Sequence, residues 1–438
     1  MLDGSPYQGY LYAYPHKTAY RPLRPRPPLR DVWAAERRDA LFLYLHLPFC
    51  EMRCGFCNLF PRANPPAEQV TAYLRQLGRQ AGAVRAALGA DARFAAGAVG
   101  GGTPTFLTAD ELVALLDLVD EMTGAPGRVP LSVETSPATA TPERLAVLAA
   151  RGTRRVSIGV QSFVDTEAHA AGRPQRRAEV DRALDAIRAA AVPVLNLDLM
   201  YGIGGQTPAS WAVSLRAALS WRPEEVYLYP LYVRPLTGLG RRGRLGAADA
   251  GWDAQRLSLY RQGRDTLRAA GYRQLSMRRF RRTGSAGPDD DYCCQDDGMV
   301  GLGCGARSYT GRLHYSFDYA VSVGGVRAVI ADYLSRPADD FTRAEVGFVL
   351  DEVERRRRWL VKTLLLAEGC DRAAWRDRFG GEVTDQFPRL AELAGRGWLT
   401  QDAGAVRLTD EGLAHGDVIG PWLVSPGVRA AMRDYELR

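Results

Sequence analysis

Three cysteines stand close together in one short segment, at Cys50, Cys54 and Cys57. Thiolates select soft metals and iron–sulfur clusters. A cubane [4Fe–4S] cluster needs four ligands and this C-x3-C-x2-C segment supplies three, so the spacing predicts one iron left open for a small molecule. Structural zinc takes four ligands, usually from two separate pairs of residues, and fits this spacing less well.

A run of three glycines, Gly100 to Gly102, precedes Thr103 and follows an apolar stretch that predicts a strand. Glycines at the end of a strand let the backbone approach a ligand closely. A glycine-rich turn is also a common structural feature, so the run indicates a binding site only through its place after the cysteine segment.

Apolar runs recur along the first half of the chain and predict the strands that carry these motifs. The first, Leu41–Leu47, leads into the cysteine segment, and five more follow: Ala95–Val99, Leu131–Glu134, Arg155–Val160, Val194–Leu199 and Val226–Leu231. Helical stretches separate most of them, such as 108–122 with a Thr108–Glu111 capping box. Alternating strands and helices predict an α/β fold, a partial (β/α)6 TIM-like barrel with its active face at the carboxyl ends of the strands.

Four regions follow from this pattern. Residues 1–40 are rich in proline and predict an irregular N-terminal arm, and 41–240 form the partial barrel. Residues 241–342 extend the barrel and carry substrate-side loops, expected over 235–250 and 281–298. A long helical pattern opens a C-terminal helical or winged-helix-like domain over 343–438, with a hairpin expected at Trp398–Leu408.

Composition narrows the class of protein. The formal charge is +7, and Lys17 and Lys362 are the only lysines among 57 basic residues. A mild arginine excess spread over the whole chain is weak evidence for nucleic-acid binding. The sequence shows neither a membrane-spanning apolar stretch nor a signal peptide, and its cysteines do not form a disulfide framework. We therefore expect a cytoplasmic protein without a membrane partner.

The chain resembles the oxygen-independent coproporphyrinogen III oxidase-like (HemN-like) family of radical S-adenosylmethionine (SAM) enzymes, from about Tyr14 into the C-terminal domain. The resemblance rests on six segments: Y-L-H-L-P-F-C ending at Cys50, G-G-G-T-P-T from Gly100, S-V-E-T-S-P at 132–137, S-I-G-V-Q ending at Gln161, Gly172-Arg173, and D-L-M-Y-G from Asp198. It implies a [4Fe–4S] cluster on the three cysteines, SAM on the open iron, a 5′-deoxyadenosyl radical, and a low-potential electron donor of the flavodoxin or ferredoxin type.

The resemblance also implies roles for single residues in binding the first SAM. The glycine segment meets the methionine end of SAM, and Arg173 pairs with its carboxylate. The candidate residues for this site are Gly101, Gly102, Thr103, Glu134, Gln161, Arg173 and Asp198. Taken singly, each carboxylate is equally well read as an exposed strand-end group, and Arg173 as one of many solvated arginines.

A second SAM lies beside the first in porphyrin-oxidising members of the family. The matching residues here are Tyr44, Tyr229, Tyr232 and the segment 301–307, which contains Cys304 and Arg307. Tyr44, Cys304 and Arg307 are the candidate catalytic residues. The tyrosines of the sixth strand are equally compatible with simple packing, and a buried inert thiol is an alternative reading of Cys304 and of Cys293 and Cys294.

Several positions depart from the porphyrin-oxidising pattern. Leu59 stands where a further cysteine is usual, Arg307 replaces an apolar residue, and Cys293 and Cys294 replace an aromatic pair of the haem-chaperone relatives. The arm segment Tyr12–Thr18 resembles that of oxidases and of radical SAM methylases and cyclopropanases. These features predict a methylase-type enzyme that uses two SAM molecules to alkylate an unsaturated or heteroaromatic carbon of a small molecule or modified peptide. Coproporphyrinogen III oxidation and haem chaperoning are the alternatives, and a nucleic-acid binder fits least.

Overall fold

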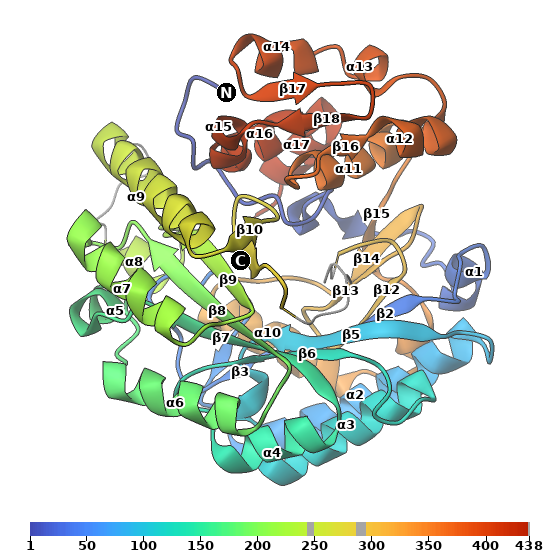
Figure 1. The fold of residues 1–438 in the computed structure, drawn as a ribbon. Coiled ribbons are helices and arrows are strands. Elements are labelled where there is room, and N and C mark those ends of the chain that lie inside the picture. The colour runs from blue at the N-terminus through green and yellow to red at the C-terminus, as the bar shows by residue number, and fades with distance from the viewer. Residues whose placement is uncertain (243–248, 286–294, 437–438) are drawn as a thin grey trace.

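The computed structural model describes residues 1–242, 249–285 and 295–436. Its body is one sheet of 13 strands in the order β1-β15-β14-β13-β12-β2-β5-β6-β7-β8-β9-β11-β10, curved as Figure 1 shows. The six strands predicted from the sequence are present and lie side by side in parallel: β2 (Leu41–Leu47), β5 (Phe94–Gly101), β6 (Leu131–Thr135), β7 (Thr153–Gln161), β8 (Val194–Tyr201) and β9 (Glu225–Pro230).

Further strands extend this parallel core at both ends. A seventh parallel strand, β12 (Met299–Leu302), pairs with β2 and was not predicted. Antiparallel strands follow on either side: β13 (Arg307–Tyr309), β14 (Leu313–Ser316), β15 (Val346–Val349) and β1 (Arg21–Pro22) at one end, β11 (Arg279–Arg282) and β10 (Tyr272–Gln274) at the other. Within the described residues β1 and β10 do not pair with each other, so the sheet is a partial barrel.

Helices cover the outer face of the parallel strands, as the βα alternation requires. They are α2 (Ala67–Leu88), α3 (Ala109–Thr123), α4 (Pro142–Ala150), α6 (Arg177–Ala189), α7 (Pro208–Ser220) and α9 (Ala250–Ala269), with the short α5 (Asp165–Ala170) beside them. In β2 every second residue, such as Leu43 and Leu45, is fully buried in the core under these helices. Successive side chains of a strand point to opposite faces, so Tyr44 and His46 project from the other, inner face of the sheet.

The predicted start of α3 is confirmed in detail. Thr108 Oγ1 accepts a hydrogen bond from Glu111 N, and Glu111 Oε2 accepts one from Thr108 N, at 3.3 and 2.9 Å. This reciprocal pair satisfies two backbone donors that the first turn of a helix leaves free.

The C-terminal domain has a hydrophobic core of its own. It contains α11 (Glu352–Leu364), a small sheet of β16 (Cys370–Asp371), β18 (Ala405–Leu408) and β17 (Leu399–Gln401), and the helices α12 (Arg372–Phe379), α13 (Val383–Gln386), α14 (Leu390–Gly395), α15 (Asp410–Ala414), α16 (Gly416–Leu423) and α17 (Pro426–Arg433). The expected hairpin is present as β17 and β18. The long helix expected from residue 343 instead begins at Glu352, because Val346–Val349 pairs with β14 in the large sheet.

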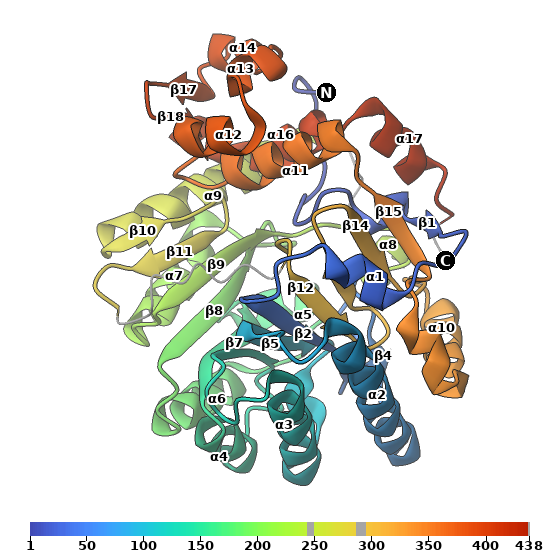
Figure 2. The same cartoon turned by 90° about the vertical axis from the view of Figure 1, so that its right-hand side faces the viewer.

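The N-terminal arm is more ordered than the sequence predicts, with η1 (Lys17–Ala19), β1 and α1 (Leu29–Ala34). Tyr7 is buried in the core of the barrel, whereas Leu2 and Tyr14 are buried in the core of the C-terminal domain. Tyr14 OH also donates to Glu354 of α11. The arm therefore runs between the two bodies and joins them, as the blue ribbon in Figure 2 shows.

The loops expected over 235–250 and 281–298 are only partly described. The first contains α8 (Gly238–Arg241) and the second begins with the end of β11. Cys293 and Cys294 lie outside the described residues. No helix in the described ranges has the length and apolar character needed to cross a membrane.

Candidate functional site

The cysteine segment leaves β2 at the carboxyl edge of the sheet and is held by its backbone. Cys50 ends the short strand β3 (Phe49–Cys50), which pairs with β4 (Arg62–Ala63). At the tip of the loop, Gly55 N donates to Gly172 O and Leu239 N donates to Gly55 O, at 3.0 and 2.7 Å. A Cβ on Gly55 would lie 2.8 Å from Ala171 O, so this close approach requires glycine.

Two of the three sulfur atoms lie near side-chain hydrogen-bond donors. Thr103 Oγ1 lies 3.5 Å from Cys50 Sγ and Arg173 Nη1 lies 3.6 Å from Cys54 Sγ, with sulfur as acceptor in each pair. Burial raises the pKa of Cys50 to about 12 and that of Cys57 to about 11, so these thiols become thiolate ligands only when a metal offsets the cost.

The donor set fits an iron–sulfur cluster. All three cysteines are free and half-buried. Hydrogen bonds to the sulfurs are one of the means by which proteins tune such clusters. Within the described ranges no group of three or more His, Cys, Asp and Glu residues, these cysteines included, is placed to hold a single metal ion. A cubane contains several irons, so Cys50, Cys54 and Cys57 would each bind a different iron of the cluster.

The glycine run brings the end of β5 between two side chains. Gly101 has φ +114°, and a Cβ there would lie 2.6 Å from the His46 ring. A Cβ on Gly100 would lie 2.9 Å from the Glu134 carboxyl group, and Gly101 N donates to Glu134 Oε2 at 3.1 Å. The glycines are therefore required by the backbone approach itself, and they orient Glu134.

Glu134 and Asp198 project from the inner face of the sheet. The Glu134 side chain is accessible to water and Asp198 is half-buried, while protein atoms surround both carboxyl groups. Burial is the main cause that raises the pKa of Glu134 to about 7 and that of Asp198 to about 6. Asn196 Nδ2 donates to Asp198 Oδ1 at 2.7 Å and partly offsets the shift. Strongly shifted carboxyl groups on an accessible inner face are typical of a binding site.

Gln161 and Arg173 meet over the end of β7. Gln161 has a positive φ of +66° at an irregularity in the pairing of β7 with β8. A Cβ on Gly159 would lie 2.8 Å from Gln161 Nε2 and 3.5 Å from Arg173 Nη1. The structure thus brings Gln161 beside Arg173, and Arg173 beside Cys54. The seven residues expected at the first SAM all lie at this edge of the sheet, and their roles remain a proposal.

The residues expected at a second SAM are only partly brought together. Tyr44 OH lies 3.2 Å from His46 Nδ1, and Tyr229 stacks on Tyr227 with ring centroids 5.9 Å apart. Tyr232 OH donates to Asp417 of α16. The four tyrosines are partly accessible, whereas His46 and Asp417 are buried.

Cys304 does not join this group. It is fully buried, its backbone N donates to Tyr73 OH at 3.1 Å, and its sulfur lies 3.7 Å from the same oxygen. Tyr73 belongs to α2, on the outer face of the sheet, so Cys304 packs away from the cysteine segment. We therefore assign no catalytic role to Cys304. Arg307, by contrast, is on the inner face, with Nη1 donating to Tyr12 OH at 3.0 Å.

Several residues of the site carry no motif in the sequence. The C-terminal domain contributes Asp417, which is 1% exposed and accepts from both Arg278 and Tyr232. The Arg278 guanidinium also lies 3.8 Å from the centroid of the Tyr10 ring. The arm and the C-terminal domain therefore complete the inner face, and only the family-like segment Tyr12–Thr18 hinted at this in the sequence.

A buried polar cluster braces the inner face below these residues. Glu225 on β9 accepts from Arg155, Arg279 and Arg281 at 2.8, 2.7 and 3.0 Å. Burial opposes ionisation of Glu225, but the arginines, Arg155 foremost, lower its pKa to about 2. The cluster ties β7, β9 and β11 together across the curved sheet.

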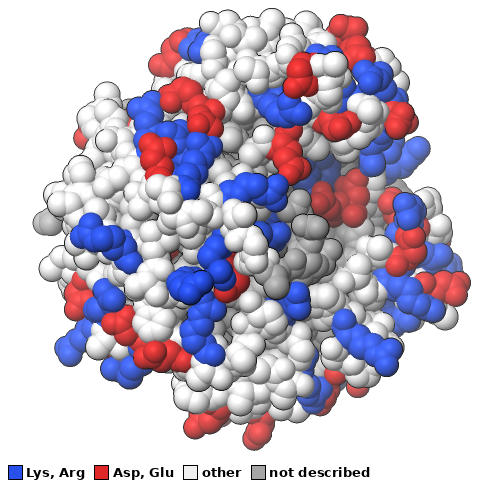
Figure 3. All heavy atoms as spheres, viewed as in Figure 1, with Lys and Arg blue, Asp and Glu red and all other residues white. Residues whose placement is uncertain are grey.

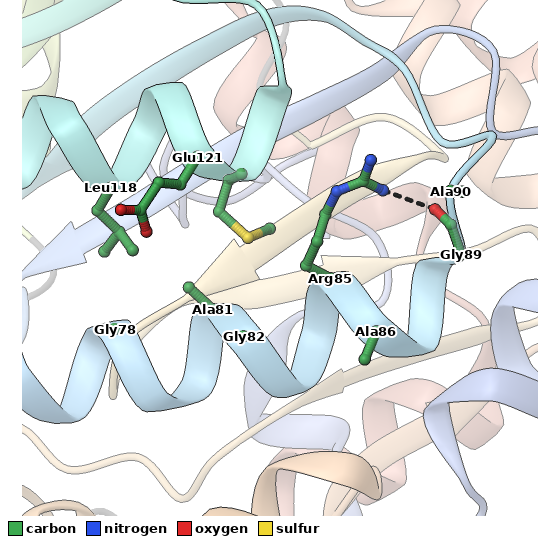
Figure 4. A pocket seen from close by; sticks show the side chains of 10 residues that line it. Gly78, Ala81, Gly82, Arg85, Ala86, Gly89, Ala90, Leu118 and Glu121 are labelled. Carbon is green, nitrogen blue, oxygen red and sulfur yellow. Dashed lines mark hydrogen bonds between the residues drawn. The ribbon is translucent and has the colours of Figure 1, made fainter.

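A hollow on the outer surface lies elsewhere. It has a volume of about 550 Å³ and lies between α2 and α3, lined by small residues such as Gly78, Ala81 and Gly82 together with Glu121 (Figure 4). It contains neither the cysteines nor the strand-end residues, so it is not the reaction site. On the face seen in Figure 3, Lys and Arg alternate with Asp and Glu and form no continuous basic surface.

Comparison with known proteins agrees with this geometry. The family model of the radical SAM superfamily matches residues 44–218, and the family model of the HemN C-terminal domain matches residues 350–415. The heme chaperone HemW of Bacillus subtilis is 27% identical over 87% of this chain and 98% of its own. The oxygen-independent coproporphyrinogen III oxidase of Pseudomonas aeruginosa is 27% identical over 94% of this chain and 91% of its own.

Among solved structures, the coproporphyrinogen III oxidase HemN of Escherichia coli covers 98% of both chains with a TM-score of 0.76 at 21% identity. This similarity shows the fold. The two family models and the two relatives together support the radical SAM superfamily and the HemN-like family, with the [4Fe–4S] cluster and SAM that the superfamily implies. They do not support the methylase subtype expected from the sequence.

The affinity for SAM is expected to depend on pH through the ionisation of Glu134. An ionised Glu134 would accept hydrogen bonds from the cationic amino group of SAM, and protonation removes that charge. Because its pKa is raised to about 7, the affinity for SAM should fall about tenfold between pH 8 and pH 6. Equilibrium dialysis with labelled SAM on the cluster-loaded chain measures this, and Glu134→Gln should flatten the profile. Glu143→Gln, at an exposed position of α4, should keep the full slope; an equally steep profile in E134Q contradicts the assignment.

Proposed function

We propose that this radical SAM enzyme is an oxidoreductase of the coproporphyrinogen III oxidase type. The observation that carries the proposal is the convergence of the cysteine segment, the strand-end residues and the N-terminal arm on one accessible inner face. The Pseudomonas aeruginosa oxidase, matched over 94% of this chain, supports it. The alkylation expected from the sequence lacks comparable support.

In this proposal each group of residues has a defined task. When bound, the cluster supplies one electron that cleaves SAM to methionine and a 5′-deoxyadenosyl radical. Glu134, Gln161, Arg173 and Asp198 bind and orient SAM so that the radical faces the substrate. Tyr44, Tyr229 and Tyr232 offer flat aromatic surfaces toward the inner face, where they pack against the substrate and exclude water.

The reaction balances for each propionate side chain that is oxidised. One hydrogen atom passes from the β-carbon to the radical and gives 5′-deoxyadenosine. The carboxylate then leaves as CO2, one electron passes to an electron acceptor, and a vinyl group remains. This chemistry needs no protein nucleophile, which agrees with the burial of Cys304 away from the site.

A second candidate function is haem chaperoning. It is favoured by the match to the Bacillus subtilis heme chaperone, which includes 98% of that protein. It predicts stoichiometric haem binding without turnover of coproporphyrinogen III.

One anaerobic turnover experiment separates these functions. The cluster-loaded chain is incubated with a reductant, coproporphyrinogen III and SAM whose methyl group carries deuterium. The oxidase proposal predicts CO2, a vinyl-bearing product, methionine and 5′-deoxyadenosine without S-adenosylhomocysteine. Deuterium in 5′-deoxyadenosine together with S-adenosylhomocysteine contradicts it in favour of alkylation. Tight haem binding with no turnover contradicts it in favour of the chaperone.

A further inference from the structure

Four basic side chains gather beside the cysteine segment without a carboxylate partner in the described part of the chain. Lys17 and His16 come from the arm, Arg307 from β13, and Arg234 from the loop after β9. Ion pairs are recorded for many arginines, but among the described residues none joins Lys17, Arg234 or Arg307 to Asp or Glu. All four side chains are half-buried. Charges taken largely out of water are ordinarily paired, so this group is unusual.

The surroundings of Lys17 explain how the charge is tolerated. Its Nζ lies 3.3 Å from the centroid of the Tyr319 ring, a cation–π contact that compensates only part of the lost hydration. Burial and the nearby Arg307 hold the pKa of Lys17 well below its usual value. Its position is therefore costly for the free protein.

Arg307 is in a similar position. Its guanidinium donates to Tyr12 OH at 3.0 Å and lies 5.1 Å from the centroid of that ring. Its Nε is buried and makes no hydrogen bond within the described structure. A donor that is desolvated but unused marks a place where a ligand acceptor fits. The Nε2 atom of His46, beneath Gly101 and Gly305, is unused in the same way.

This group adjoins the expected cluster. Tyr319, under Lys17, donates from its hydroxyl to Asn58 O at 3.2 Å, and Asn58 directly follows Cys57. Tyr12 OH lies 3.4 Å from His16 Nε2 and accepts a hydrogen bond from Arg307 Nη1 at 3.0 Å. Lys17 directly follows His16 in the chain, so Arg307, His16 and Lys17 lie in one neighbourhood. A ligand group held here lies next to the reacting centre.

We propose that Lys17 and Arg307 form an anion site that binds a carboxylate group of the molecule held over the cluster. This inference rests on the proposed function and names the feature of the substrate that the inner face recognises. The same chemistry fits a substrate carboxylate or the carboxylate of a second SAM. Arg307 thus has a specific task at a position where the family pattern has an apolar residue.

The first test uses the scarcity of lysine in the chain. Lys17 and Lys362 are the only two lysines, and Lys362 of α11 pairs with Asp296, so it serves as an internal control. Brief acetylation by acetic anhydride, followed by peptide mass spectrometry, reports each lysine separately. Coproporphyrin III or SAM should protect Lys17 and leave the labelling of Lys362 unchanged. Protection by coproporphyrin III alone identifies a substrate carboxylate, and protection by SAM alone identifies the second SAM.

The second test measures affinity in variants that keep the side-chain bulk. Lys17→Met and Arg307→Met should each lower the affinity for the ligand that protects Lys17 by at least about 30-fold, because a desolvated charged partner of that ligand is removed. Arg30→Met, at a highly exposed arginine of α1, is the matched control and should bind normally. The iron content of all three variants should equal that of the unsubstituted chain.

Thermal unfolding distinguishes a binding role of Lys17 from a structural one. If Lys17 stabilised the fold, its replacement would lower the melting temperature. Removing an unpaired, half-buried charge should leave the melting temperature of Lys17→Met unchanged or raise it. A lower melting temperature with unchanged ligand affinity would overturn the inference, as would labelling of Lys17 that neither ligand affects. Both tests measure binding without turnover, so a chain that fails to decarboxylate coproporphyrinogen III can still confirm the anion site.

Discussion

Replacing Cys50, Cys54 and Cys57 together by alanine should abolish cluster binding and SAM cleavage. Anaerobic reconstitution of the unsubstituted chain should give about four irons per chain and a broad visible absorbance, because three thiolates hold one cubane. The triple variant has no ligand left in the segment and should retain almost no iron. Iron analysis and the amount of 5′-deoxyadenosine formed after reduction measure both effects.

A matched control tests whether the loss is specific to the segment. Cys370 is a buried cysteine of β16 in the C-terminal domain, and Cys370→Ala should keep the full iron content. Four irons per chain in the triple variant would show that the cluster is held elsewhere, and the assignment of the site would fail.

The second large effect expected is a loss of stability when Glu225 is replaced. Glu225→Gln keeps the shape of the side chain but leaves Arg155, Arg279 and Arg281 in the interior without their shared negative charge. Removing one partner of a buried ion pair costs about 3–5 kcal/mol. We expect a decrease of that size in the free energy of unfolding, measured by urea denaturation of the whole chain.

The control for this prediction is a carboxylate at the surface of the protein that also pairs with arginines. Glu352 of α11 pairs with Arg355 and Arg356 and is 51% exposed, so Glu352→Gln should change the free energy of unfolding by less than about 1 kcal/mol. Equal effects of the two substitutions would show that the interior cluster is not specially stabilising.

The pH dependence of the Glu225 effect has a definite sign. The pKa of Glu225 is lowered from 4.5 to about 2 in the folded chain, so its ionisation stabilises the fold above the higher of these values. That stabilisation is lost as the pH falls through the lower one. The difference between the unsubstituted chain and Glu225→Gln should therefore be constant near neutral pH and shrink below about pH 4.5. A difference that grows on acidification would contradict the proposed ionisation state.

The core of the fold was predictable because its signals are local. The six parallel strands and α3 follow from apolar runs and a capping box that lie within a few residues of one another. The strands β12 to β15 were not predicted. They are short, and what stabilises them is pairing with strands far away in the sequence, as when Met299–Leu302 pairs with β2.

The same difference separates the two halves of the candidate site. The cysteine segment, the glycine run and the strand-end residues could be recognised because each motif is contiguous in the chain and the parallel order brings the strand ends to one edge. From the sequence, Cys304 was a candidate catalytic residue, with a buried inert thiol as the alternative. In the structure the Cys304 side chain points to the outer face and packs against Tyr73. A glycine-rich segment does not indicate to which face of the sheet its side chains point.

The sequence by itself determined the class of chemistry, since three thiolates at fixed spacing specify an iron–sulfur ligand set whatever surrounds them. Only the tertiary structure decided which other side chains lie over the inner face, opposite the cysteine segment. Arg307 meets Tyr12 across 295 positions and Tyr232 meets Asp417 across 185. Such contacts form because the arm and the C-terminal domain bury their own apolar residues together, and burying them places polar side chains over the inner face. No local pattern encodes that docking, because its free energy comes from surfaces that meet only after the chain has folded.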